Sequence, residues 1–65
     1  MNSHAQIQIA YEALCKGPQT QMDLVKAGMN PIKLTARMRD LRVRLQGRGM
    51  DWLNRNGTYE LVRPV

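Results

Sequence analysis

Hydrophobic residues recur at intervals of three and four in three stretches of the chain, which is the pattern of helices that bury one face. The first stretch places five such residues on one helix face: Ile7, Ala10, Tyr11, Leu14 and Cys15. Ser3 and Gln6 form a capping-box pattern at its start. Thr20 and Asp23 repeat that pattern before a short second helix, and Gly28 suits the left-handed conformation that ends it.

The third apolar stretch predicts a longer helix. Asn30 followed by Pro31 is the pattern of an N-cap and a first helical residue, so we expect this helix to cover residues 31–46. Gly47 is its stop signal. At about 100° per residue, four side chains of this helix share one buried stripe. They are Leu34, Met38, Leu41 and Leu45.

Two short strand-like segments, Met50–Leu53 and Thr58–Val62, follow the third helix. They flank the segment Asn54–Gly57, whose Asn-Gly pair is the strongest short-range signal for a β-hairpin turn. The pattern as a whole predicts an α+β domain in which three helices precede a C-terminal hairpin over residues 50–62.

The charge of the chain is localised. Its 65 residues have room for one domain with a small core, and a net charge of +5 favours an anionic partner, nucleic acid first. The excess lies between residues 30 and 55, where only Asp40 and Asp51 are acidic. The basic residues there are Lys33, Arg37, Arg39, Arg42, Arg44, Arg48 and Arg55. The alternative is a solvated helix surface with an Asp40–Arg44 pair, but so many like charges would repel one another without a partner.

Three residue types that often carry chemistry occur once each. Cys15 cannot form an intrachain disulfide, and its place on the apolar face of the first helix predicts a core residue. His4 has no second ligand near it in the sequence, so we expect no metal site. Trp52 can stack on a base or anchor the core, and we favour burial beside Tyr59 and Leu61.

Catalytic and membrane patterns are absent from the sequence. The five carboxylates are scattered and belong to no Ser/His/Asp set, so we expect neither an enzyme nor a cofactor. The chain also lacks a leader-like start and any apolar run of the roughly 18 residues that a membrane span needs. We therefore expect a soluble, unprocessed cytoplasmic protein with no membrane partner.

The segment around the third helix carries a motif. A turn glycine, an Asn-Pro helix start and spaced apolar residues follow one another: Gly28, Asn30, Pro31, Leu34, Met38 and Leu41. From Thr20 to Leu45 this resembles a helix-turn-helix, and with the hairpin most of the chain resembles small winged helix-turn-helix proteins of phages and prophages. The segment Leu34–Arg42 is also similar to a Leu-x-Ala-Arg-Ile-x-Asp-Leu-Arg stretch of phage winged-helix proteins.

The resemblance implies a recognition helix, residues 31–46, in the major groove of double-stranded DNA, and a wing, residues 50–62, on the backbone. The residues whose positions reach base edges are Asn30, Lys33, Thr35, Arg37 and Arg39. The residues that suit phosphates are Thr20, Gln21, Arg42, Arg44, Arg48 and Arg55. The function implied is a transcriptional regulator or an accessory factor for recombination, bound near the bacterial nucleoid, with a homodimer as a further hypothesis.

Three apolar residues, Ile32, Ala36 and Val43, lie opposite the buried stripe, on the side that should face DNA. They can touch thymine methyl groups, bury against the first helix, or mark a protein interface. The last option leads to an alternative function, a module that inhibits or redirects a host protein. Single-stranded nucleic acid is disfavoured, because three aromatic residues offer few platforms for stacking.

Overall fold

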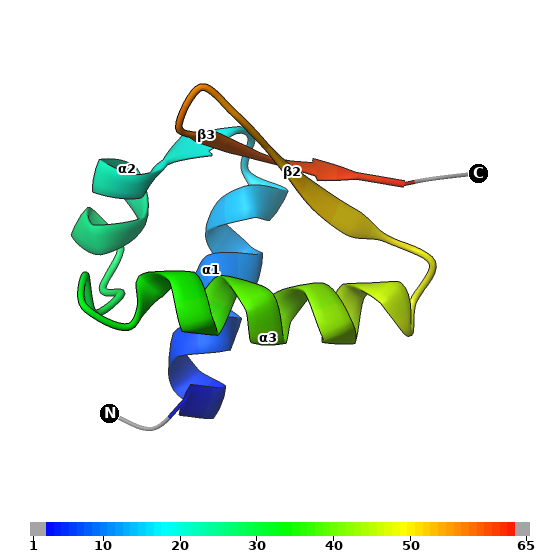
Figure 1. The fold of residues 1–65 in the computed structure, drawn as a ribbon, viewed down its shortest axis with the longest axis horizontal. Coiled ribbons are helices and arrows are strands. Elements are labelled where there is room, and N and C mark those ends of the chain that lie inside the picture. The colour runs from blue at the N-terminus through cyan, green and yellow to red at the C-terminus, as the bar shows by residue number, and fades with distance from the viewer. Residues whose placement is uncertain (1–2, 64–65) are drawn as a thin grey trace.

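The computed structural model of the protein describes residues 3–63, which form three helices and one three-stranded antiparallel sheet. Along the chain the elements are α1 (Ser3–Cys15), β1 (Gln19–Thr20), α2 (Gln21–Lys26), α3 (Leu34–Gln46), β2 (Asp51–Arg55) and β3 (Thr58–Val62) (Figure 1). In that view α1 passes behind α3, and the hairpin of β2 and β3 lies above α3. The α+β class and the order of three helices before a hairpin are confirmed.

β1 is an element that the hydrophobic pattern does not predict. It joins the hairpin as a third strand, in the order β1-β3-β2, and its two residues lie opposite Tyr59 and Thr58 of β3. Two residues are too few to show the alternation of apolar and polar side chains that marks a strand. The pairing fixes the segment between α1 and α2 against the hairpin.

The hairpin turn consists of Asn56 and Gly57, whose φ angles are both positive, at 53° and 85°. Positive φ at both central residues is what a type I′ turn requires, so the Asn-Gly signal is confirmed. β2 runs on to Arg55 instead of ending at Leu53, which makes the hairpin tighter than the four-residue connection expected.

The core lies between the helices and the inner face of the sheet. Its buried apolar residues are Ile7, Ala10, Ala13, Leu14, Leu24, Met29, Leu34, Met38, Leu41, Leu45, Trp52 and Tyr59. The predicted stripe of α3 is thus confirmed. Cys15, however, is exposed, so its predicted place in the core is wrong. The buried arc of α1 is centred on Ala10 and includes Gln6, and Cys15 lies about 140° away around the helix.

Trp52 anchors the hairpin on α3, as expected. Its side chain is buried, and its Nε1 donates a hydrogen bond to the carbonyl oxygen of Met38 at 2.7 Å. The Tyr59 ring meets it edge to face, with the ring centroids 5.1 Å apart. Such an aromatic pair contributes about 0.5–1.5 kcal/mol beyond the burial of its area. Trp52 is therefore a core residue and not an exposed surface for base stacking.

Thr20 and Asp23 form the predicted capping box of α2. Thr20 Oγ1 accepts from Asp23 N at 3.1 Å, and Asp23 Oδ2 accepts from Thr20 N at 3.0 Å. These backbone and side-chain hydrogen bonds lower the pKa of Asp23. Gly28 follows the helix with φ at 121°, which confirms the positive φ expected at its end.

α3 begins at Leu34, three residues later than expected, so the prediction of a helix over residues 31–46 is wrong at its start. Asn30 is not the N-cap, because its Oδ1 accepts from the backbone N of Ile32 at 2.9 Å and so stabilises a turn. Lys33 takes the cap position without a side-chain hydrogen bond. The helix ends at Gln46, before Gly47, as predicted.

Gln6 holds this turn from α1. Its side chain is buried, its Nε2 donates to Gly28 O at 3.1 Å, and its Oε1 accepts from Asn30 N at 2.7 Å. The side chain of Ser3, its expected partner in a capping box, lies outside the described structure. Gln6 thus links α1 to the segment that precedes α3.

Candidate nucleic-acid interface

Two of the seven basic residues between positions 30 and 55 are neutralised by acids of the same stretch. Arg37 Nη1 lies 2.9 Å from Asp40 Oδ2, and Arg42 Nε lies 3.0 Å from Asp51 Oδ1. The Asp40–Arg44 pair that belongs to the alternative of a solvated helix surface does not form, because Asp40 pairs with Arg37, one turn earlier. Within residues 3–63, five of the seven have no acidic partner: Lys33, Arg39, Arg44, Arg48 and Arg55. The structure separates these five into two groups.

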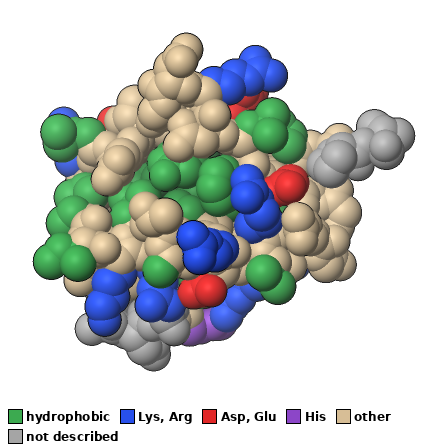
Figure 2. Space-filling model, in the orientation of Figure 1, with side chains coloured by type: hydrophobic (Ala, Val, Ile, Leu, Met, Phe, Trp, Pro, Cys, Tyr) green, Lys and Arg blue, Asp and Glu red, His purple; other side chains and the backbone are tan. Residues whose placement is uncertain are grey.

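The first group, which we call the outer cations, is Lys33, Arg39 and Arg55. All three are exposed, and none of their side chains forms a hydrogen bond or an ion pair within the described chain. Lys33 stands at the start of α3, and Arg39 lies about 140° around that helix from the buried Leu34. Arg55 is the last residue of β2, beside the hairpin turn. Basic side chains gather along the side of the molecule where α3 lies (Figure 2).

The five residues predicted to reach base edges are not equally placed for it. Lys33, Thr35 and Arg39 are exposed, and the last two lie one turn apart on the same face of α3. Asn30 is exposed, but its Oδ1 is already engaged by Ile32 N. Arg37 is directed to Asp40, and 21% of its side chain is exposed. Of the five, Lys33, Thr35 and Arg39 are therefore the ones whose side chains are exposed and without a partner in the described part of the chain.

Three of the residues predicted to contact phosphates, Thr20, Gln21 and Arg55, lie at the same end of the sheet, with β3 between them. The register places Thr20 opposite Thr58, and Thr58 opposite Arg55 on the other side of β3. Since Gln21 follows Thr20 as the first residue of α2, the start of this helix lies across the sheet from the end of β2. Figure 1 shows the hairpin turn and the beginning of α3 on the side of the molecule where α2 lies.

Arg42, also predicted to contact a phosphate, instead clamps the hairpin to α3. Its Cζ lies 4.0 Å from the centroid of the Trp52 ring, and its Nη2 donates to Trp52 O at 3.2 Å. Asp51 Oδ1, its ion-pair partner, also accepts from Trp52 N at 2.7 Å. Burial raises the pKa of Asp51, but the hydrogen bonds from Trp52 N and Arg42 outweigh this and lower it.

This clamp also covers part of an open sheet edge. β2 is an edge strand, and Trp52 turns its backbone N–H and carbonyl away from β3, because Arg55 and Thr58 flank a two-residue turn as a hydrogen-bonded pair. Asp51 accepts from that N–H and Arg42 donates to that carbonyl. Unpaired edges invite pairing with another chain, so the clamp limits association through β2.

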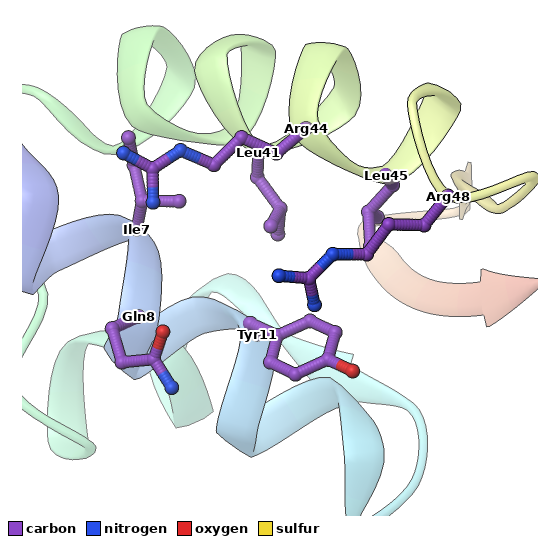
Figure 3. A pocket seen from close by; sticks show the side chains of 7 residues that line it. All are labelled: Ile7, Gln8, Tyr11, Leu41, Arg44, Leu45 and Arg48. Carbon is purple, nitrogen blue, oxygen red and sulfur yellow. The ribbon is translucent and has the colours of Figure 1, made fainter.

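The second group of cations without an acidic partner consists of Arg44 and Arg48, which we call the pocket arginines. Their side chains reach toward α1. Arg44 Nη2 lies 2.9 Å from His4 Nδ1, and Arg48 Cζ lies 5.7 Å from the centroid of the Tyr11 ring. Both residues line a pocket between α1 and α3 (Figure 3). They are exposed, yet they lie beside the outward face of α3 and not on it.

The apolar residues opposite the buried stripe stay in solvent. Ile32 is 90% exposed and Val43 is 70% exposed, and Ala36 is exposed as well. The option that they bury against the first helix is therefore wrong: α1 packs against the other side of α3, where Leu41 and Leu45 lie. Contact with thymine methyl groups and a protein interface remain as hypotheses.

No family model matches the chain, and neither a curated protein nor a solved structure is significantly similar to it. Among residues 3–63, no three His, Cys, Asp or Glu side chains gather closely enough to hold a metal ion. In the same part of the chain, no helix combines the length and the apolar character that crossing a membrane requires.

Proposed function

We propose that the protein binds double-stranded DNA as a winged helix-turn-helix domain, with α3 in the major groove and the β2–β3 hairpin on the phosphate backbone. The observation that carries this proposal is the group of outer cations, which are exposed and unpaired on α3 and at the hairpin turn. Cations of this kind supply the attraction to phosphates, and an arginine to guanine is the commonest specific base contact.

The arrangement of the elements supports the proposal. Three helices and a sheet with the order β1-β3-β2 are consistent with a winged-helix-like layout, in which α2 and α3 form the helix-turn-helix. α3 has 13 residues and is therefore about 20 Å long, enough to lie along a major groove. A lone domain of this size buries only about 600–1,000 Å² on DNA, so we propose that two copies act on adjacent half-sites.

In this function the protein controls transcription or assists recombination by occupying or bending a short duplex site. Thr35 and Arg39 face the bases, Lys33 and Arg55 face the backbone or bases beside them, and Val43 contacts a thymine methyl group. The start of α2, at Thr20 and Gln21, lies across the sheet from Arg55 and provides a further backbone contact.

A second candidate function is a module that binds a host protein through Ile32, Ala36 and Val43. The exposed fractions of Ile32 and Val43, at 90% and 70%, favour it, because large apolar side chains in solvent often mark an interface. This reading leaves the outer cations without a role except toward an acidic partner.

The test is a fluorescence-anisotropy titration of a labelled, mixed-sequence duplex at several salt concentrations. We expect the wild type to bind with micromolar affinity that falls as salt rises. Arg39→Gln should weaken binding about tenfold. Arg63 is exposed and directly follows β3, and Arg63→Gln removes the same charge and should change binding less than about threefold.

Each outcome separates the two candidates. If the wild type fails to bind any duplex at low salt, the DNA proposal is wrong, and the next experiment is capture of a host protein. Under the second candidate, Val43→Asp should abolish that capture and Arg39→Gln should not. If Arg39→Gln and Arg63→Gln weaken duplex binding equally, attraction by net charge explains the binding and α3 has no special part.

A further inference from the structure

A pocket lies between α1 and α3 (Figure 3), and none of the outer cations lines it. Its lining residues are Ile7, Gln8 and Tyr11 from α1 and Leu41, Arg44, Leu45 and Arg48 from α3 and its exit. The space in it is about 30 Å³, far below the roughly 300–1,000 Å³ of small-molecule sites. It has room for no more than the tip of one side chain of another molecule.

The pocket carries positive charge that nothing in its wall neutralises. Both pocket arginines line it and no lining residue is acidic. Figure 3 shows both side chains reaching from α3 toward α1, with Arg48 above the Tyr11 ring. Glu12, the acid that accepts from Gln8 Nε2 at 3.3 Å, is not part of the wall. The pocket is therefore complementary to an anionic group.

The floor of the pocket narrows the chemistry of that group. Ile7, Leu41 and Leu45 line the pocket beside the two arginines, and Leu41 lies between their guanidinium groups in Figure 3. A hydrated phosphate gains nothing from such apolar side chains. A segment that carries carboxylates beside an apolar side chain matches both features, because carboxylates pair with guanidinium groups while the apolar side chain covers the floor.

We propose that this pocket docks an acidic, amphipathic segment of a partner protein. Its carboxylates pair with Arg44 and Arg48, and an apolar side chain of the segment lies against Ile7 and Tyr11. The site goes beyond DNA binding and does not depend on it. Because the pocket lies beside the outward face of α3, the segment and a DNA duplex can be bound at the same time.

Two other occupants fit the charges less well. A second copy of this chain carries the same net charge of +5, and Asp23, Asp40 and Asp51 are already engaged within their own fold. A DNA phosphate would have to leave the outward face of α3, where the outer cations stand, and reach a pocket with an apolar floor.

The test uses the full chain and a fluorescein-labelled synthetic helix of about 18 residues, in which a leucine stripe is flanked by glutamates. The pocket variant is Arg44→Gln with Arg48→Gln. The matched control is Lys33→Gln with Arg39→Gln, which removes the same charge from α3 but on the outer side. Circular dichroism and thermal melting of each variant verify that it is folded.

We expect the pocket variant to weaken binding of the helix at least about tenfold and the control variant less than about threefold. With a labelled DNA duplex as the probe, the order should reverse. A wild type that does not bind the helix at low salt overturns the proposal, as does an equal loss in both variants, which is general charge attraction. Loss of duplex binding alone in the pocket variant overturns it too and makes the pocket a phosphate site. A wild type that binds the helix but no duplex sinks the proposed function and keeps this site.

Discussion

Gln6 shows how one buried polar side chain positions α3. Only 7% of the residue is exposed, and its amide joins α1 to Gly28 and Asn30, residues 22 and 24 positions further along the chain. A glutamine in the first turn of an amphipathic helix is ordinarily a capping or surface residue. The sequence pattern could not reveal its role, because nothing local in it indicates which distant backbone groups the amide will meet.

Replacing Gln6 with Met keeps the length of the side chain and removes both of these hydrogen bonds. The Gly28 carbonyl and the Asn30 N–H lose a partly buried hydrogen bond each, and such a bond contributes about 0.5–1.5 kcal/mol, so we expect the free energy of unfolding to fall by about 1–3 kcal/mol. Urea unfolding followed by circular dichroism measures it. Gln8→Met is the control: Gln8 is exposed, and its loss should change stability by less than about 0.5 kcal/mol. Equal effects would show that the Gln6 bridge contributes nothing special.

The stability of the fold depends on the ionisation of Asp51. Its pKa in the folded protein lies below the ordinary value of 3.8, so the ionised carboxylate stabilises the fold above that pH. The contribution is lost as the pH falls below 3.8 and through the lower pKa of the folded state. Asp51→Asn lacks this contribution. We therefore expect the difference in Tm between wild type and variant to be constant near neutral pH and to shrink in acid. A difference that stays constant down to about pH 2 would contradict this account.

At the scale of elements, the hydrophobic pattern predicts the buried face of a helix better than it predicts where the helix begins. The stripe from Leu34 to Leu45 follows from the geometry of one helix, and it is correct. The start of α3 depends on a competition, because an asparagine before a proline can cap a helix or form a turn with its own side chain. Here Asn30 forms the turn, while Gln6 holds its backbone N–H. The sequence contains both possibilities and no local signal that decides between them.

The candidate site, too, could be predicted from the sequence only in part. The sequence shows that positive charge is concentrated between residues 30 and 55. It does not show how the fold divides these basic residues between different surfaces. Arg42 lies on the side of α3 where β2 returns, and there it meets Trp52 and Asp51. Arg44 lies on the other side, where α1 packs, and lines the pocket. Which flank meets which neighbour depends on the packing of whole elements, so the basic residues could not be sorted from helix geometry alone.

The need for glycine in the hairpin turn can be tested by comparing substitutions of Gly57 and Gly47. Gly57 has φ at 85°, and a Cβ there would touch nothing within 4 Å, so Gly57→Ala carries a conformational cost without a clash. We expect it to lower the free energy of unfolding by about 1–2 kcal/mol. Gly47, the cap of α3, has φ at −64°, so Gly47→Ala should be neutral or slightly stabilising. Thermal melting of both variants measures the two changes in stability. A larger loss of stability for Gly47→Ala would show that the positive φ of the type I′ turn is not what makes Gly57 sensitive to substitution.

At the scale of the whole molecule, two ion pairs decide where the net charge acts. Arg37 and Arg42 are neutralised by acids within the fold, and the five remaining cations of the central stretch fall into the outer cations and the pocket arginines. The same Arg42–Asp51 pair covers part of the edge of β2, which disfavours association through that strand. Two separate basic surfaces are thus left, which we propose for DNA and for an acidic partner, in a chain of 65 residues.

This partition predicts the salt dependence of DNA binding. If Lys33, Arg39 and Arg55 are the only cations that lie against the duplex, whether at a base or at a phosphate, each bound chain displaces about three counterions, and the slope of log K against log salt is about −2.7 per chain. Engagement of Arg44 and Arg48 as well would bring it to about −4.5. Titrations across salt, with the stoichiometry fixed by sedimentation, measure the slope. Arg55→Gln should reduce its magnitude by about 0.9, and Arg48→Gln should leave it unchanged. If the slope is near −4.5 and Arg48→Gln reduces its magnitude, the pocket arginines also contact DNA, and the outer cations and the pocket arginines are not two separate binding surfaces.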